Sequence, residues 1–122
     1  MIGHIQGKVW GTTQCIFGHN NVEMHRIATN KGGYCSVHCH RTKFNLFFVE
    51  CGKLKVTIFR GAETEPRPTD STELIAGMSS VVKPGERHQF EALEDTVAYE
   101  IYWTQLDSED IIRDTEGGIR RP

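Results

Sequence analysis

The sequence of 122 residues has no long run of apolar residues and no strong excess of charge of either sign. No stretch reaches the length of about 20 apolar residues that a membrane-spanning helix needs. The formal net charge is −2, which gives no electrostatic reason to expect binding to nucleic acid or to an anionic membrane. The N-terminus, MIGHIQGKVW, has neither the basic start nor the apolar run of a signal peptide. We therefore expect a cytoplasmic protein that binds neither nucleic acid nor a membrane.

Helical periodicity, internal repeats and linkers are also absent from the pattern of the sequence. Apolar and polar residues instead alternate over short segments between turn residues, which is typical of strands. We expect a first pair of strands within residues 7–17, a strand carrying His38 and His40, and further strands at residues 22–29, 43–51, 54–59, 73–76, 79–83 and 96–104. The pattern predicts an all-β protein.

The polar, proline-bearing residues 60–72 separate two of these segments and read as a loop. A chain of this length forms one domain around one core. We therefore expect a single domain over residues 1–122. The polar ends, residues 1–6 and 114–122, are expected to be loosely ordered.

Three histidines occur in two short motifs. The first reads His38-x-His40, four residues, Asn45, six residues, Gly52, and the second reads Gly77, six residues, Pro84-Gly85, two residues, His88. Because alternate side chains of a strand leave the same face, His38 and His40 can both reach one ion. With His88 they form a candidate three-histidine metal site.

A zinc knuckle built from Cys35, Cys39 and the same histidines is a competing interpretation. On a regular strand these two cysteines lie about 13 Å apart and face away from the histidines. No second pair of cysteines follows at the spacing that zinc fingers and ribbons use.

A domain of this size also needs no disulfide. We expect the four cysteines to be free, largely buried thiols.

The two motifs, over about residues 33–92, resemble the paired signature of the cupin superfamily. The resemblance implies a double-stranded β-helix, also called a jelly-roll barrel, with a divalent transition metal such as zinc, manganese, iron or nickel. It implies His38, His40 and His88 as ligands. Asn45 stands where the family usually has a glutamate, and a neutral amide oxygen is a weaker ligand. Both a three-histidine site with an open side and a four-ligand site that includes Asn45 are therefore compatible with the sequence.

Four further residues are candidates for acid–base or substrate-binding roles. Lys43 lies two residues before Asn45, so it either faces the mouth of the barrel, where it binds an anionic group or acts as a base, or extends into solvent. Glu100 and Tyr102 alternate with apolar neighbours, and form an acid–base pair only if their face is the interior. His25 lies on the strand before the first motif, and it too can contribute to the site only if its side chain faces the interior.

A shorter resemblance covers residues 100–114, which are similar to the end of the cupin domain of type II mannose-6-phosphate isomerases. Together the resemblances imply metal-assisted isomerisation or epimerisation of a small sugar or sugar-derived acid. The ion would polarise the carbonyl and adjacent hydroxyl of the substrate, while a nearby base moves the proton. A three-histidine iron dioxygenase and a non-catalytic cupin that binds a small ligand are the alternatives, because one fold serves all three.

Apolar side chains on the strand at residues 43–51 also alternate on the face opposite Asn45. These side chains are Phe44, Leu46 and Phe48. A small barrel has few helices to cover such a surface. We therefore expect a homodimer whose strands meet across the interface.

Overall fold

The computed structural model describes residues 2–60, 67–105 and 107–121 of the chain. These residues form nine strands and no helix. The strands are β1 (Ile5–Lys8), β2 (Gly11–His19), β3 (Val22–Thr29), β4 (Phe44–Cys51), β5 (Lys53–Arg60), β6 (Arg67–Ile75), β7 (Ser79–Val82), β8 (Arg87–Ala92) and β9 (Thr96–Trp103). No helix that could cross a membrane occurs in these parts of the chain.

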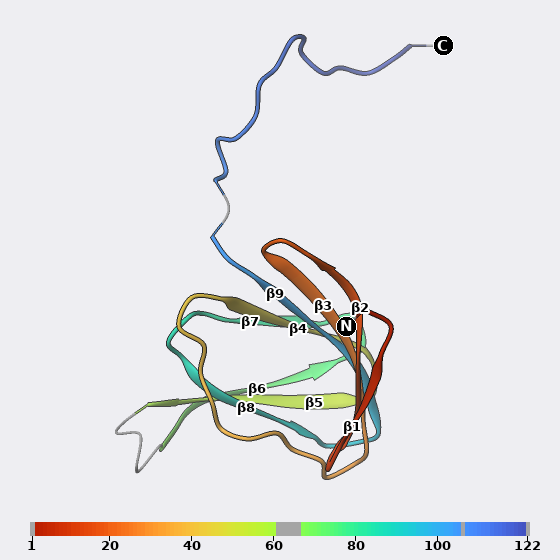
Figure 1. Cartoon of the computed structure of the whole chain (residues 1–122), viewed down its shortest axis with the longest axis vertical. Coiled ribbons are helices and arrows are strands. Elements are labelled where there is room, and N and C mark those ends of the chain that lie inside the picture. The colour runs from red at the N-terminus through yellow and green to blue at the C-terminus, as the bar shows by residue number, and fades with distance from the viewer. Residues whose placement is uncertain (1, 61–66, 106, 122) are drawn as a thin grey trace.

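The strands form two antiparallel sheets that face each other (Figure 1). The larger sheet has the order β1-β2-β3-β9-β4-β7, and the smaller has the order β6-β5-β8. Alternate residues of each sheet point inward: Ile27 and Phe47 from the larger sheet meet Leu54 and Phe90 from the smaller one, and all four are at most 2% exposed. The predicted all-β double-stranded β-helix is confirmed.

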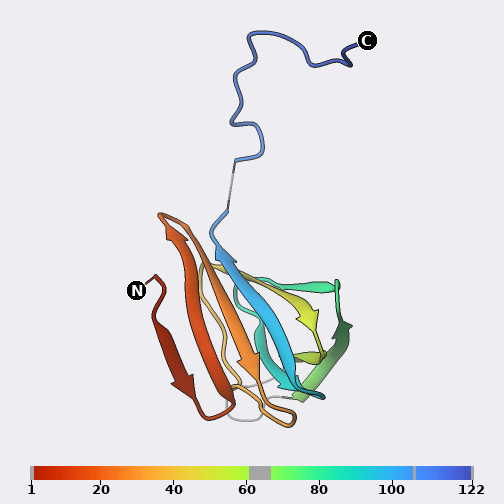
Figure 2. The same cartoon turned by 90° about the vertical axis from the view of Figure 1, so that its right-hand side faces the viewer.

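Strand β9 lies between β3 and β4 in the larger sheet; Figure 2 shows it in blue beside the orange β3. Its register aligns residues of the two neighbouring strands. Glu100 of β9 stands opposite His25 of β3, and Tyr102 stands opposite Asn45 of β4. Glu100 is only 8% exposed, which places its side chain on the inner face of the sheet. The register of β9 therefore brings four candidate site residues onto one inner wall.

Two segments differ from the sequence-based expectation. Residues 67–72, expected to be a loop, belong to β6, because their backbone pairs with β5 and this pairing outweighs the weak strand propensity of polar residues. Residues 61–66 of the expected loop lie outside the described residues. The segment with the first two histidines is not a regular strand, since it makes only two isolated bridges, Tyr34 with Glu91 and His38 with His88.

The N-terminal end of the described chain is part of the larger sheet, whereas the C-terminal end is not. Ile5 and Gln6, expected to be loosely ordered, belong to β1 and pair with β2, and the amide of Gly3 donates to the Cys15 carbonyl at 2.6 Å. Residues 107–121 form no strand and extend away from the barrel in both views (Figures 1 and 2). The expected loose N-terminal segment is therefore shorter than predicted.

Candidate metal centre

The three histidines of the two motifs meet inside the barrel. His38 and His40 come from the irregular segment before β4, and His88 comes from β8. Two backbone hydrogen bonds join the segments: His38 donates to the His88 carbonyl at 3.1 Å, and His88 donates to the His38 carbonyl at 2.9 Å. One ring nitrogen from each histidine lies within 4.8 Å of the other two. The backbone bridge therefore gathers the three imidazoles, although His38 and His40 do not share a regular strand.

Hydrogen bonds to backbone carbonyls fix the ring orientation of two of these histidines. Nδ1 of His38 lies 2.8 Å from the Ser36 carbonyl oxygen, and Nδ1 of His88 lies 3.0 Å from that of Glu86. A carbonyl oxygen can only accept, so each Nδ1 carries a proton, and in the neutral form of each ring Nε2 has a free lone pair. This arrangement is typical of histidines that bind a metal through Nε2.

The inner nitrogens of His40 and His88 have no hydrogen-bond partner among the described residues, although both Nε2 atoms are buried. A buried polar atom without a partner is costly unless it binds something. Burial, followed by the charge of Lys43, lowers the pKa of His40 to about 4, and burial also lowers the pKa of His88. Both imidazoles are therefore neutral near pH 7, as metal binding requires. The three-histidine set fits a divalent transition metal.

Asn45 is fully buried on β4. Its Nδ2 donates to Glu100 Oε2 at 3.2 Å, while its Oδ1 has no partner among the described residues. The amide thus orients the carboxylate of Glu100, and its carbonyl oxygen is left available. Its role as a fourth ligand stays a prediction.

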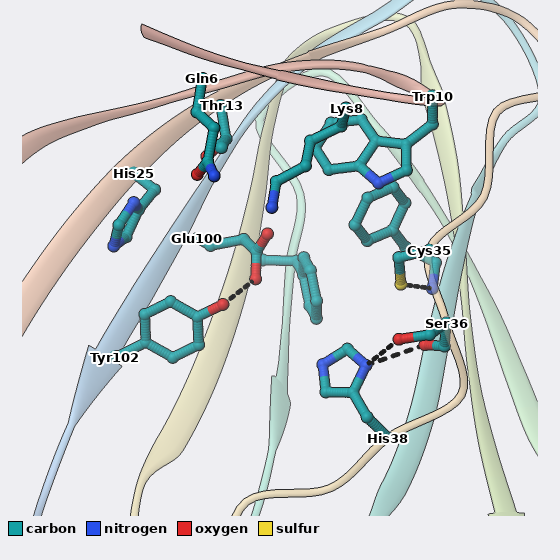
Figure 3. Close-up of a pocket in the computed structure, with 12 residues that line it drawn as sticks. Gln6, Lys8, Trp10, Thr13, His25, Cys35, Ser36, His38, Glu100 and Tyr102 are labelled. Atoms are coloured by element: carbon teal, nitrogen blue, oxygen red, sulfur yellow. Dashed lines mark hydrogen bonds between the residues drawn. The ribbon is translucent and has the colours of Figure 1, made fainter. Parts of the chain in front are cut away.

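A cavity of about 320 Å³ opens beside His38, and Figure 3 shows its lining. Its lining includes the predicted site residues His38, His25, Glu100 and Tyr102. Tyr102 donates its hydroxyl proton to Glu100 Oε2 at 2.5 Å, and burial together with the charge of Glu100 raises the pKa of Tyr102. Glu100 therefore accepts two hydrogen bonds from its own wall and presents a carboxylate to the cavity.

Lys43 does not line this cavity, although it lies close enough to His40 for its charge to lower the pKa of that imidazole. Its Nζ stands 4.2 Å from the centroid of the Tyr102 ring, and it lines a separate hollow near the β2–β3 turn. Lys8 of β1, which the sequence analysis missed, does line the cavity, and its side chain extends toward Glu100 (Figure 3). The alternation of Gln6 and Lys8, which share one face of a short strand, is the signal that could have identified it.

Cys35 also lies where the sequence did not place it. Its side chain lines the same cavity as His38, and its sulfur accepts a hydrogen bond from the Phe90 amide at 3.2 Å. The segment is irregular between these residues, so the alternation of a regular strand does not apply. Burial raises the pKa of the Cys35 thiol to about 11. All four cysteines are free, but Cys39 and Cys51 are exposed, so only half of them are buried as expected.

Comparison with solved structures identifies the fold. No protein-family model and no curated protein sequence matches the chain. A solved RmlC-like cupin from Shewanella frigidimarina NCIMB 400 is similar, with a TM-score of 0.69 and 20% identity over 90% of this chain and 89% of that chain. The structure of KdgF from Halomonas sp. has a TM-score of 0.67 and 17% identity over 84% of this chain and 89% of that one.

A third similar structure is the oxalate decarboxylase of Lactobacillus farciminis in complex with formate. Its TM-score is 0.69 and its identity is 18%, over 88% of this chain and 32% of that chain. At such identities structural likeness establishes the fold. The chain has the double-stranded β-helix fold of the cupins.

Proposed function

We propose that His38, His40 and His88 hold a divalent transition metal, and that the protein isomerises or epimerises a small sugar-derived acid in the adjacent cavity. The observation that carries the proposal is the juxtaposition of three imidazoles, two of them neutral near pH 7, and a buried carboxylate. The inner nitrogens of two histidines lack partners among the described residues, and Glu100 lines the cavity that His38 also lines. A bound ion supplies Lewis acidity toward a carbonyl or hydroxyl oxygen.

Glu100 is the base in this proposal. Its carboxylate removes the proton from the carbon next to the substrate carbonyl and, in isomerisation, returns it to the neighbouring carbon on the same face; in epimerisation Glu100 keeps this proton and water delivers another to the opposite face. Tyr102 and Asn45 hold the carboxylate in place through their hydrogen bonds of 2.5 Å and 3.2 Å. Because the pKa of Tyr102 is raised, its hydroxyl keeps its proton and continues to donate while Glu100 is ionised. Tyr102 and Asn45 therefore act as positioning residues.

Lys8 is the residue that would recognise the acid group of the substrate. Its side chain extends into the cavity, and no hydrogen bond or ion pair joins it to another described residue. An unpaired ammonium in a cavity favours an anionic ligand. The similarity to a decarboxylase of oxalate supports a small carboxylic acid as the substrate class. Lys43, considered from the sequence for this role, contacts the Tyr102 ring, and its role stays a prediction.

The first test is metal analysis of the untagged protein beside a His38→Ala/His88→Ala variant. We expect the variant to lose one equivalent of transition metal relative to the parent. The parent is then incubated with hexuronic acids in deuterium oxide, and proton NMR follows exchange of the carbon-bound proton. We expect exchange at the same rate with and without oxygen. An unchanged metal content in the variant would refute the site.

The same assay separates the alternatives. Turnover that requires iron and consumes oxygen would show that the protein is a dioxygenase and not an isomerase. Ligand binding without exchange, for any loaded metal, would favour the non-catalytic binding protein. The resemblance of residues 100–114 to type II mannose-6-phosphate isomerases stays a prediction, and the proposal does not depend on it.

We also propose that the outer face of the larger sheet forms a homodimer interface. Phe44 stacks on Trp103 with ring centroids 5.3 Å apart, and Leu46 pairs with Val81 and Ile101 on the same face. Val81 is 43% exposed, and no element of the described chain covers it. An apolar sheet face of this kind suits a second copy related by two-fold symmetry, because the same surface then covers itself.

Leu46→Glu is expected to convert the dimer to a monomer, because each protomer would bring a carboxylate into an apolar interface. Light scattering at micromolar concentration measures the mass. Ile112→Glu, which changes a 93% exposed residue of the C-terminal tail, serves as the control and should stay dimeric. A monomeric parent would exclude this interface.

A further inference from the structure

A second group of metal-binding side chains lies outside the three-histidine site, on the hairpin of β2 and β3. Cys15 belongs to β2, and Glu23 and His25 belong to β3. One ligand atom from each of these three side chains lies within 4.8 Å of the other two. The group shares no residue with the three-histidine site, so its chemistry requires a separate explanation.

Strand register brings these side chains together. Cys15 stands directly opposite His25, and Glu23 lies two residues before His25, so all three leave the same face of the hairpin. A β-bulge between Cys15 and Phe17 then shifts the pairing, so that Gly18 stands opposite Glu23. A Cβ atom at Gly18 would lie 3.7 Å from Glu23 Cγ and 3.9 Å from Cys15 Sγ. The bulge and the glycine leave the thiol and the carboxylate without a side chain between them.

The present contacts of the group leave its donors available. The ring nitrogen Nε2 of His25 lies 3.1 Å from Glu23 Oε1. The thiol of Cys15 makes one weak hydrogen bond, to the Phe17 carbonyl at 3.6 Å. Cys15 is 9% exposed, whereas the side chains of His25 and Glu23 are 22% and 54% exposed. An ion therefore has a route from solvent past Glu23 to a buried sulfur.

We propose that Cys15, Glu23 and His25 bind a zinc ion. Thiolate, imidazole and carboxylate are the three ligand types that zinc uses in proteins, and three protein ligands leave the fourth position for water or another ligand. Sulfur favours zinc over magnesium or calcium. Two zinc ligands are separated by roughly 3 to 4 Å in a tetrahedral site, so side-chain rotations close the present spacing.

Binding at this site has a defined proton balance. The Cys15 thiol releases its proton to solvent and becomes the thiolate ligand. Where His25 donates to Glu23, its proton moves to the other ring nitrogen, which frees a lone pair for the ion. The His25 ring also lies 5.6 Å from that of Tyr102 and lines the cavity. A zinc-bound His25 is therefore a ligand at the cavity wall and is not available as the base of the proposed isomerisation.

Cobalt(II) loading tests the site because only thiolate ligation gives an intense sulfur-to-cobalt charge-transfer band in the near ultraviolet. The three-histidine site has no sulfur ligand, so the band reports on the second site alone. We expect the band in the cobalt-loaded parent and in the His38→Ala/His88→Ala variant. We expect its loss in Cys15→Ala, together with the loss of one equivalent of bound zinc.

Two further variants test whether another thiol or a loss of folding explains the result. Cys39→Ala removes an exposed thiol and should keep the band. Glu23→Gln changes a half-exposed side chain, leaves the buried sulfur in place and should weaken zinc binding at least tenfold. A parent without the band, a Cys15→Ala variant that keeps it, or a Glu23→Gln variant with parental zinc affinity would each overturn the proposal. Failure of the three-histidine site to bind metal would leave this band unchanged, so the two proposals are tested separately.

Discussion

Glu100→Gln is expected to lower kcat for proton exchange by about 10²- to 10⁴-fold, the usual contribution of a general base. The amide has the shape of the carboxylate and can still accept the hydrogen bond that Tyr102 now donates to Glu100. It cannot take up the substrate proton at neutral pH. The measurement is the steady-state rate of deuterium incorporation, with metal content determined on the same samples. We expect metal content and KM to stay close to those of the parent.

The matched control is Glu73→Gln, which removes an exposed carboxylate that pairs with Lys53 on the smaller sheet at 3.4 Å. Its kcat should equal that of the parent. Tyr102→Phe removes one hydrogen bond from Glu100 but leaves the base, so it should cost less than Glu100→Gln. If Glu100→Gln retains full kcat, another group transfers the proton and the assignment of the base is wrong.

Gly52→Ala is expected to lower the free energy of unfolding by about 2 to 5 kcal/mol, a large part of the stability of a small domain. Gly52 has φ of 95°, a left-handed conformation that disfavours any side chain. A Cβ atom there would lie 2.3 Å from the Asp95 carbonyl oxygen and 2.7 Å from Thr96 Cα, both in the backbone. The turn and the start of β9 would have to move apart.

Gly77→Ala provides the matched control. Gly77 has φ of 86°, but a Cβ atom there would meet nothing within 4 Å. It should lose about 1 kcal/mol from conformational strain alone. Urea unfolding followed by tryptophan fluorescence gives both values. Equal losses in the two variants would show that the close approach of β9 to Gly52 does not contribute.

The sequence motifs predicted that His38, His40 and His88 would lie together, because this grouping depends on residue type and order. The irregular segment carrying His38 and His40 still reaches His88 through two backbone hydrogen bonds. Regular alternation was the wrong model for its neighbours, however. It placed Cys35 away from the histidines, whereas the structure places Cys35 on the same cavity wall as His38. Where a segment makes only isolated bridges, the alternation of a regular strand no longer predicts the side to which each side chain points.

The remaining differences arise from pairing between segments that are distant in the sequence. The orientation of Glu100 depends on the register of β9 against β3 and β4, which no local pattern specifies. The assignment of residues 67–72 to a strand depends in the same way on their partners in β5. The contribution of Lys8 to the cavity requires β1 to pair at the edge of the larger sheet. Local propensity does not encode these long-range contacts.

The position of β9 between β3 and β4 has a consequence for folding. Before β9 is in place, the larger sheet consists of two separate pieces, β1-β2-β3 and β4-β7, with no hydrogen bonds between them. The strand that joins them is the last of the nine in the described chain. Folding therefore depends on contacts of high sequence separation, which are typical of slowly folding β proteins. During synthesis on the ribosome, the inner apolar faces around Ile27 and Phe47 stay without their central neighbour until residues 96–103 emerge, and nascent chains are exposed to aggregation for that interval.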